Sequence, residues 1–206
     1  MRMPRPKRIR PVQQRSRDTT ATLIDATARV LTAHGYAHLT TNHVAREAGV
    51  SVGTLYRYFA DKAELVEAVR DRTATEITAT LTAAMSASVS DNLEPVDGFR
   101  HLTATMVEAI ETHRGVVRAL LSEAPLGLYS NVFPEIEQTL GHFGRLLITI
   151  VRPDLTREQR ESMVYIGMAV FATACFRIAI DPPPYIDKPW VIDQAARLLA
   201  PALTPG

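Results

Sequence analysis

The feature that most constrains this 206-residue chain is a pair of short helix patterns joined by a glycine turn, within residues 39–65. Thr40 or Thr41 can cap the first helix, and Gly49 suits the left-handed conformation that often ends a helix. Ser51 can then cap the second helix. Two helices separated by a three-residue turn that contains glycine form the helix-turn-helix pattern, so the sequence predicts this motif here.

The predicted second helix carries more exposed polar groups than its packing requires. Val52, Leu55 and Phe59 fall on one face at spacings of three and four residues, which makes that face the buried one. Gly53 costs a helix about 1 kcal/mol relative to alanine, so its presence suggests that a base edge or phosphate approaches closely. Capped helix pairs with a glycine turn also occur in all-α proteins that never touch DNA. The motif alone leaves both interpretations open.

The first 17 residues form a basic segment. They contain seven of the chain's 23 lysine and arginine residues and none of its 22 acidic residues. Prolines at positions 4, 6 and 11 disfavour a helix, so we expect residues 1–15 to be an extended, disordered arm. Such an arm could neutralise DNA phosphates or enter the minor groove, as homeodomain arms do. The alternatives are a solubilising tail and a remnant of gene annotation.

The rest of the sequence predicts helices almost everywhere, about nine in all, and no convincing strand. Further helices are expected near residues 13–34, 97–112, 115–122, 134–152, 157–180 and 188–200. Another long helix begins near Lys62, and its stripe at every fourth position from Leu65 to Val89 is apolar except at Thr73. Because a helix repeats every ~3.6 residues, this stripe rotates around the helix, and its two ends can face different domains.

We therefore expect an all-α chain in three parts. These are the arm at residues 1–15, a three-helix helix-turn-helix domain at 16–64 and a larger helical domain at 65–206.

The segment 163–176 is apolar on every side of its predicted helix. Such a helix must be covered all round, and a domain of this size has few helices with which to cover it. We therefore expect a second copy of the chain to cover it, together with the last helix. The alternative is the central helix of a monomeric bundle. The residues expected at the dimer interface are Met163, Gly167, Val170, Phe171, Ala174, Val191, Ala195, Leu198 and Leu199.

Nothing in the sequence points to catalysis, a cofactor or a metal. His34, His38 and His43 are spaced four and five residues apart, but a predicted loop intervenes and no cysteine joins them. An apolar helix surrounds Cys175, which raises the pKa of a thiol rather than activating it. The single cysteine also fits a reducing cytoplasm, and no uncharged run reaches the roughly 18 residues of a membrane span. We therefore expect a cytoplasmic protein that is not an enzyme.

Residues 16–65 resemble the DNA-binding domain of the TetR family of transcriptional regulators. The resemblance rests on Gly35-Tyr36, Leu-Thr-Thr at 39–41, Val-Ala-Arg-Glu-Ala-Gly-Val-Ser at 44–51, Gly-Thr-Leu-Tyr-Arg-Tyr-Phe at 53–59 and Asp-Lys-Ala-Glu-Leu at 61–65. It implies phosphate contacts by Thr41, Tyr56, Tyr58 and Lys62, and a groove-facing set of Ser51, Val52, Gly53, Thr54 and Arg57. Arg57 is the strongest candidate for reading a base, because arginine binds the O6 and N7 edge of guanine bidentately.

The resemblance also implies that the helical domain binds an effector and forms a dimer. The residues expected at the effector site are Met106, His113, Tyr129, Phe133, Tyr165, Met168 and Phe176, although each could be ordinary core. Outside residues 1–17 the chain has 16 basic residues (23 − 7) and 22 acidic residues, so this part is acidic. An acidic protein with an aromatic interior suits a lipophilic or cationic small molecule. We therefore expect a homodimeric repressor that binds a palindromic operator in double-stranded DNA and releases it when the effector binds. The alternative is an effector-independent architectural or chromosome-associated DNA-binding dimer.

Overall fold

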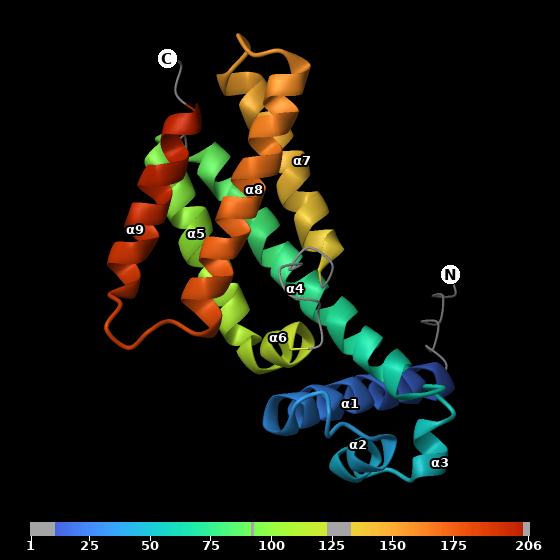
Figure 1. Cartoon of the computed structure of the whole chain (residues 1–206). Coiled ribbons are helices and arrows are strands. Elements are labelled where there is room, and N and C mark those ends of the chain that lie inside the picture. The colour runs from blue at the N-terminus through green and yellow to red at the C-terminus, as the bar shows by residue number, and fades with distance from the viewer. Residues whose placement is uncertain (1–10, 92, 123–132, 204–206) are drawn as a thin grey trace, which may run out of the picture. The chain divides into compact units, whose positions relative to one another are not determined.

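The computed structural model describes residues 11–91, 93–122 and 133–203, which contain nine α-helices, one short 3-10 helix and no strand. The predicted all-α class is therefore confirmed. The chain divides into two compact units, Met1–Val69 and Arg70–Gly206 (Figure 1). The division falls inside α4 (Lys62–Ser90), a few residues after the boundary expected from the sequence.

The first unit contains α1 (Pro11–His34), α2 (Thr41–Glu47), α3 (Val52–Leu55) and the beginning of α4. Its core is made of apolar side chains from all four helices and from the turn before α2: Leu23, Leu31, Leu39, Val44, Leu55, Leu65 and Val69. α1 begins at a proline, which the first turn of a helix tolerates because its N–H group would be unpaired there anyway. The expectation of an extended arm over residues 1–15 is therefore wrong for residues 11–15, and residues 1–10 lie outside the described part.

The second unit holds the rest of α4, then α5 (Pro95–Thr112), α6 (Arg114–Leu121), α7 (Pro134–Val151), α8 (Arg157–Ile180), α9 (Lys188–Leu199) and the 3-10 helix η2 (Ala200–Leu203). α5 packs against both α8 and α9, and α7 packs against α8. Met106 and Ile110 of α5 are buried at this centre, as are Cys175 of α8 and Ala196 of α9. Burial raises the pKa of the Cys175 thiol far above its ordinary range, so this cysteine is a packing residue.

The second unit covers α8 on one side only. Thr156 and Gln159 form the predicted capping box at the start of this helix. Phe171 and Cys175 point into the unit, whereas Ile166 and Val170 remain 59% and 47% exposed. By length and composition alone, α8 is apolar enough to cross a membrane, a property that core helices of soluble proteins share. Its exposed apolar side is therefore a surface that the described chain leaves uncovered.

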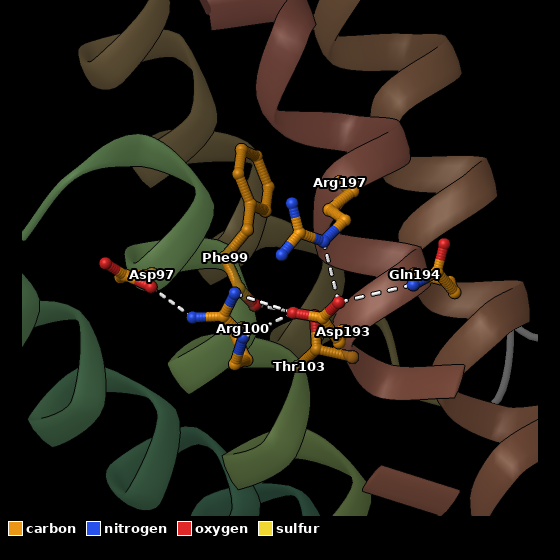
Figure 2. A network of polar contacts seen from close by, with 7 residues as sticks. All are labelled: Asp97, Phe99, Arg100, Thr103, Asp193, Gln194 and Arg197. Atoms are coloured by element: carbon orange, nitrogen blue, oxygen red, sulfur yellow. Dashed lines mark hydrogen bonds and ion pairs between the residues drawn. The ribbon is translucent and has the colours of Figure 1, made fainter. Parts of the chain in front are cut away.

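A polar network around Asp193 fastens α9 to α5 (Figure 2). Asp193 accepts hydrogen bonds from Nε and Nη2 of Arg100, at 2.8 and 2.6 Å, and from Nε of Arg197 at 2.7 Å. Asp97 pairs with the other end of the Arg100 guanidinium, and Gln194 donates to Asp193 at 3.2 Å. The hydrogen bonds from Arg197 and Arg100 hold the pKa of Asp193 below its ordinary value.

Candidate DNA-binding site

The two short helices and their turn form as the sequence predicts. Thr40 caps α2 by accepting a hydrogen bond from the backbone N–H of His43 at 3.1 Å. Gly49 ends the helix with φ at +68°, a left-handed conformation that costs glycine little. The Ser51 hydroxyl then caps α3 by accepting from the N–H of Thr54 at 3.0 Å. The helix-turn-helix therefore spans α2 and α3.

The second helix is shorter than the apolar spacing predicts. α3 ends at Leu55, Tyr56 is its C-cap, and the chain turns before Phe59. Leu55 and Phe59 are nevertheless both buried, as expected, and the N–H of Phe59 donates to the Leu55 carbonyl at 3.0 Å. The prediction that Val52, Leu55 and Phe59 share one helical face is therefore wrong, because the helix ends before Phe59.

Two hydroxyl pairs lie on the outer side of this motif. Oγ of Ser51 and Oγ1 of Thr54 are 2.8 Å apart at the start of α3. Oγ1 of Thr41 on α2 and the hydroxyl of Tyr56 after α3 are 3.1 Å apart. Ser51 and Tyr56 are exposed, and Thr41 and Thr54 are half-buried. The structure thus brings expected site residues from both helices into direct contact.

Arg57 carries an exposed positive charge that is not used within the described part of the chain. Its guanidinium has no hydrogen bond or ion pair there. Arg29, by contrast, donates from Nε to Glu47 at 2.6 Å, which joins α1 to α2 and holds the pKa of Glu47 below its ordinary value. Arg57 is therefore available to an external acceptor, whereas Arg29 stabilises the unit.

The remaining expected residues differ in their burial and in their contacts within the chain. A Cβ atom added at Gly53 would meet only Oγ of Ser51, at 3.9 Å, so packing within the chain does not require glycine there. Val52 and Tyr58 are half-buried. Lys62, expected at a phosphate, is half-buried and contacts Tyr36, with Nζ 2.7 Å from the carbonyl oxygen and 3.8 Å from the ring centre.

A cavity of about 670 Å³ lies in the second unit among side chains of α5, α7 and α8 and Phe133, which precedes α7. Five of the seven expected effector residues line it: Met106, Phe133, Tyr165, Met168 and Phe176. His113 does not line the cavity, and its Nε2 lies 3.4 Å from Oε2 of Glu76. Tyr129 lies outside the described residues.

Sequence reasoning missed most of the polar groups of the cavity. Glu137, Arg145 and Glu161 also line it, and Nε of Arg145 donates to both carboxylate oxygens of Glu161, at 3.1 and 3.0 Å. This pair joins α7 to α8. No periodic pattern could have revealed it, because its partners lie on different helices and both are exposed surface residues by sequence.

The residues expected at a dimer interface fall into three groups. Val170 and Leu198 are exposed, and Met163, Gly167, Ala174, Val191, Ala195 and Leu199 are half-buried. Phe171 is only 5% exposed within the single chain, so nearly all of its side chain packs inside the unit. Ile166 and Trp190, which lie outside the predicted interface set, also have large apolar side chains that are more than half exposed.

A capped helix pair with an outward set of hydroxyls and a free arginine, followed by a separate helical unit, defines a helix-turn-helix DNA-binding protein. Residues 23–69 match the family model described as bacterial regulatory proteins of the tetR family. This match covers 47 of the 206 residues and supports the TetR-family transcriptional regulator that the sequence predicts. The family consists of regulators and not enzymes.

Curated relatives share part of the chain. The nucleoid occlusion factor SlmA of Haemophilus ducreyi is 33% identical over 90 residues, which are 44% of this chain and 43% of that protein. SlmA of Haemophilus influenzae is 25% identical over 126 residues, which are 61% of this chain and 56% of that protein. The chain thus spans about half the length of these curated relatives.

Solved structures share the whole fold. A protein assigned to the TetR family from Mesorhizobium loti superposes with a TM-score of 0.67 at 17% identity, over 90% of this chain and 96% of that chain. The transcriptional repressor FadR of Thermus thermophilus, in complex with lauroyl-CoA, superposes with a TM-score of 0.59 at 19% identity, over 87% and 92%. At these identities the likeness shows the fold.

Proposed function

We propose that the chain is a homodimeric repressor that binds a palindromic DNA operator and releases it when a small molecule occupies the cavity of the second unit. The observation that supports DNA binding is the set of solvent-accessible hydroxyls on the helix-turn-helix together with the guanidinium of Arg57, which is unpaired in the described part of the chain. Thr41, Tyr56 and Tyr58 supply hydroxyls for phosphates. The groove-facing residues are Ser51, Val52, Gly53, Thr54 and Arg57.

Arg57 is the proposed base-reading residue. It is exposed and has no partner within the described part of the chain, and its planar fork matches the O6 and N7 edge of guanine. Two recognition helices in a twofold dimer would read the two halves of a palindrome.

The test uses a duplex that the wild-type chain selects from a random-sequence pool. Arg57→Ala should weaken binding to this duplex by about 1–3 kcal/mol and relax the preference at one base position of each half-site. Arg118→Ala removes an exposed arginine of α6 in the second unit and serves as the matched control, which should bind like the wild type. An equal loss of affinity for every duplex sequence would show that Arg57 does not read a base.

The cavity supports a lipophilic effector. Its inner walls include Met106, Phe133 and Phe176, all buried, while two carboxylates and one guanidinium line it elsewhere. This excess of negative charge suits a ligand with an apolar body and a cationic head. The repressor FadR of T. thermophilus, complexed with lauroyl-CoA, is a relative in fold that is associated with a small molecule.

His113 and Arg114 connect α8, which lines the cavity, to α4. His113 lies within 3.4 Å of Glu76 on α4, and Arg114 donates from Nε and Nη2 to the Ile180 carbonyl at the end of α8, at 2.9 and 2.5 Å. α8 lines the cavity, and α4 continues into the first unit. An effector that binds better to one arrangement of these contacts would shift α4 and so reduce affinity for the operator.

The similarity to nucleoid occlusion factors favours a second candidate, an effector-independent chromosome-associated DNA-binding dimer. A panel of lipophilic cations and neutral lipophilic compounds, tested for release of the selected duplex, separates the two. Release by a compound, abolished when Ala172→Trp fills the cavity, supports the repressor. Retention of the duplex with every compound supports the second candidate.

A further inference from the structure

Three residues on one face of α7 line the cavity of the second unit. Glu137, Gly141 and Arg145 follow one another at intervals of four residues, so they lie one above the other along the helix. Because an α-helix rises about 1.5 Å per residue, Glu137 and Arg145 are separated by ~12 Å along α7. The helix therefore presents a carboxylate and a guanidinium to the cavity at two separate points.

The guanidinium of Arg145 already has an acidic partner. Its Nε donates to both carboxylate oxygens of Glu161 on α8, at 3.1 and 3.0 Å. A Cβ atom added at Gly141 would lie 3.3 Å from Nη1 of Arg145, so the arginine side chain reaches back over this glycine. Arg145 and Glu161 thus neutralise each other at the wall of the cavity.

Glu137 retains a negative charge that no other described residue compensates. Its carboxylate has no hydrogen bond or ion pair within residues 11–91, 93–122 and 133–203. Phe133, one helical turn earlier, and Phe176 of α8 are buried and line the same cavity. The cavity thus combines one free carboxylate with apolar and aromatic walls, which suits a cation with an apolar body.

We propose that Arg145 determines the charge selectivity of the cavity. It neutralises Glu161 and leaves Glu137 as the counter-ion, so the cavity binds amphiphiles with one cationic group and discriminates against those with two. A second cationic group ~12 Å from the first would meet the guanidinium of Arg145, and like charges repel. This inference rests on the proposed effector site and names the residues that select its ligand.

Two probes that share a ten-carbon chain test this selectivity. Decyltrimethylammonium carries one quaternary ammonium group, and decamethonium carries one at each end. Calorimetric titration of the full-length chain without DNA measures the dissociation constant of each probe. The wild type should bind decyltrimethylammonium about fivefold more tightly than decamethonium, the effect of one exposed charge pair. Ala172→Trp, which fills the cavity, should abolish binding of both probes.

Arg145→Met should reverse the preference, because it frees the carboxylate of Glu161. Affinity for decamethonium should rise about fivefold, and affinity for decyltrimethylammonium should change much less. Adding Glu161→Gln should cancel this gain, whereas Glu137→Gln alone should weaken binding of decyltrimethylammonium about fivefold. Arg152→Met gives the same change in net charge and is the control, because Arg152 pairs with Asp154 and does not line the cavity.

Urea unfolding establishes that each variant is folded, and Arg145→Gln provides the same test if Arg145→Met does not fold. The proposal is overturned if Arg145→Met binds decamethonium no better than the wild type, or if neither probe binds. Tighter binding of decanoate than of decyltrimethylammonium to the wild type would also overturn it, because Arg145 would then be capturing an anion. If the probes bind with the expected selectivity but do not release the selected duplex, the selectivity is supported and release by an effector is contradicted.

Discussion

Thr41 at the start of α2 and Tyr56 at the end of α3 place their hydroxyl oxygens 3.1 Å apart, although fifteen positions separate them in the chain. When two hydroxyls share one hydrogen bond, one of them keeps an unused O–H group. Tyr56 is 52% exposed, so its O–H group can reach an external acceptor when Thr41 is the donor of the pair. A pair of this kind joins the two helices and also offers a donor to a phosphate oxygen.

Tyr56→Phe should therefore weaken DNA binding without a loss of folding stability. The lost hydrogen bond corresponds to about 0.5–1.5 kcal/mol of binding free energy, and the free energy of unfolding should change by less than about 0.5 kcal/mol at this exposed site. Selected and unselected duplexes should lose affinity equally, because phosphate contacts carry no sequence information. Tyr185→Phe, at an exposed tyrosine of the second unit, is the control. A loss confined to the selected duplex would argue against the phosphate role.

Gly53→Ala should separate folding from DNA binding. The added Cβ meets only Oγ of Ser51, at 3.9 Å, so the fold accepts it, and alanine should stabilise the chain by about 0.4–1 kcal/mol. The same methyl group faces the groove in the proposed complex and should lower affinity for the selected duplex. Urea unfolding and duplex titration measure the two effects. Gly98→Ala, in α5 with open space around its Cβ position, provides the comparison. Unchanged affinity in Gly53→Ala would mean that DNA does not approach this residue.

Local signals predicted the helix-turn-helix almost completely. The caps at Thr40 and Ser51 and the left-handed Gly49 depend on residues no more than a few positions away, so the sequence alone contains them. The length of α3, by contrast, could not be predicted from nearby residues. α3 ends at Leu55, and Phe59 is buried although it lies beyond the helix. Where the helix ends therefore depends on tertiary packing in the first unit.

The cavity and the exposed surface of α8 were harder to predict for a different reason. Ile136 and Leu140 line the cavity, but in the sequence they belong to an ordinary apolar stripe of their helix. Phe171 and Val170 are adjacent and both apolar, yet the first is buried in its own chain and the second is exposed. Periodicity shows that a helix needs cover; it does not show which side its own chain covers.

Ile166→Glu combined with Val170→Glu should disrupt the proposed dimer. Both side chains are about half exposed on the uncovered side of α8, so charges there cost the single chain little. In an interface the same unpaired carboxylates would be buried, and the dissociation constant of the dimer should rise at least about a hundredfold. Sedimentation equilibrium measures this change. Ile150→Glu, at an exposed isoleucine of α7, is the matched control. A wild-type chain that sediments as a monomer would contradict the dimer.

Asp193→Asn should destabilise the second unit in a pH-dependent way. Hydrogen bonds from Arg197 and Arg100 lower the pKa of Asp193, so its charged form is favoured in the folded state. A lowered folded pKa adds stability above the ordinary aspartate value of about 3.9, and this stability is lost as pH falls through the folded pKa. The difference in urea midpoint between wild type and Asp193→Asn should therefore be constant from pH 7 to about pH 5 and shrink below about pH 4. Asp154→Asn breaks a pair with Arg152 inside one turn and should cost less, because that pair joins no two helices. A difference that stays constant to the lowest pH would show that Asp193 stabilises the packing of α5 and α9 without its charge.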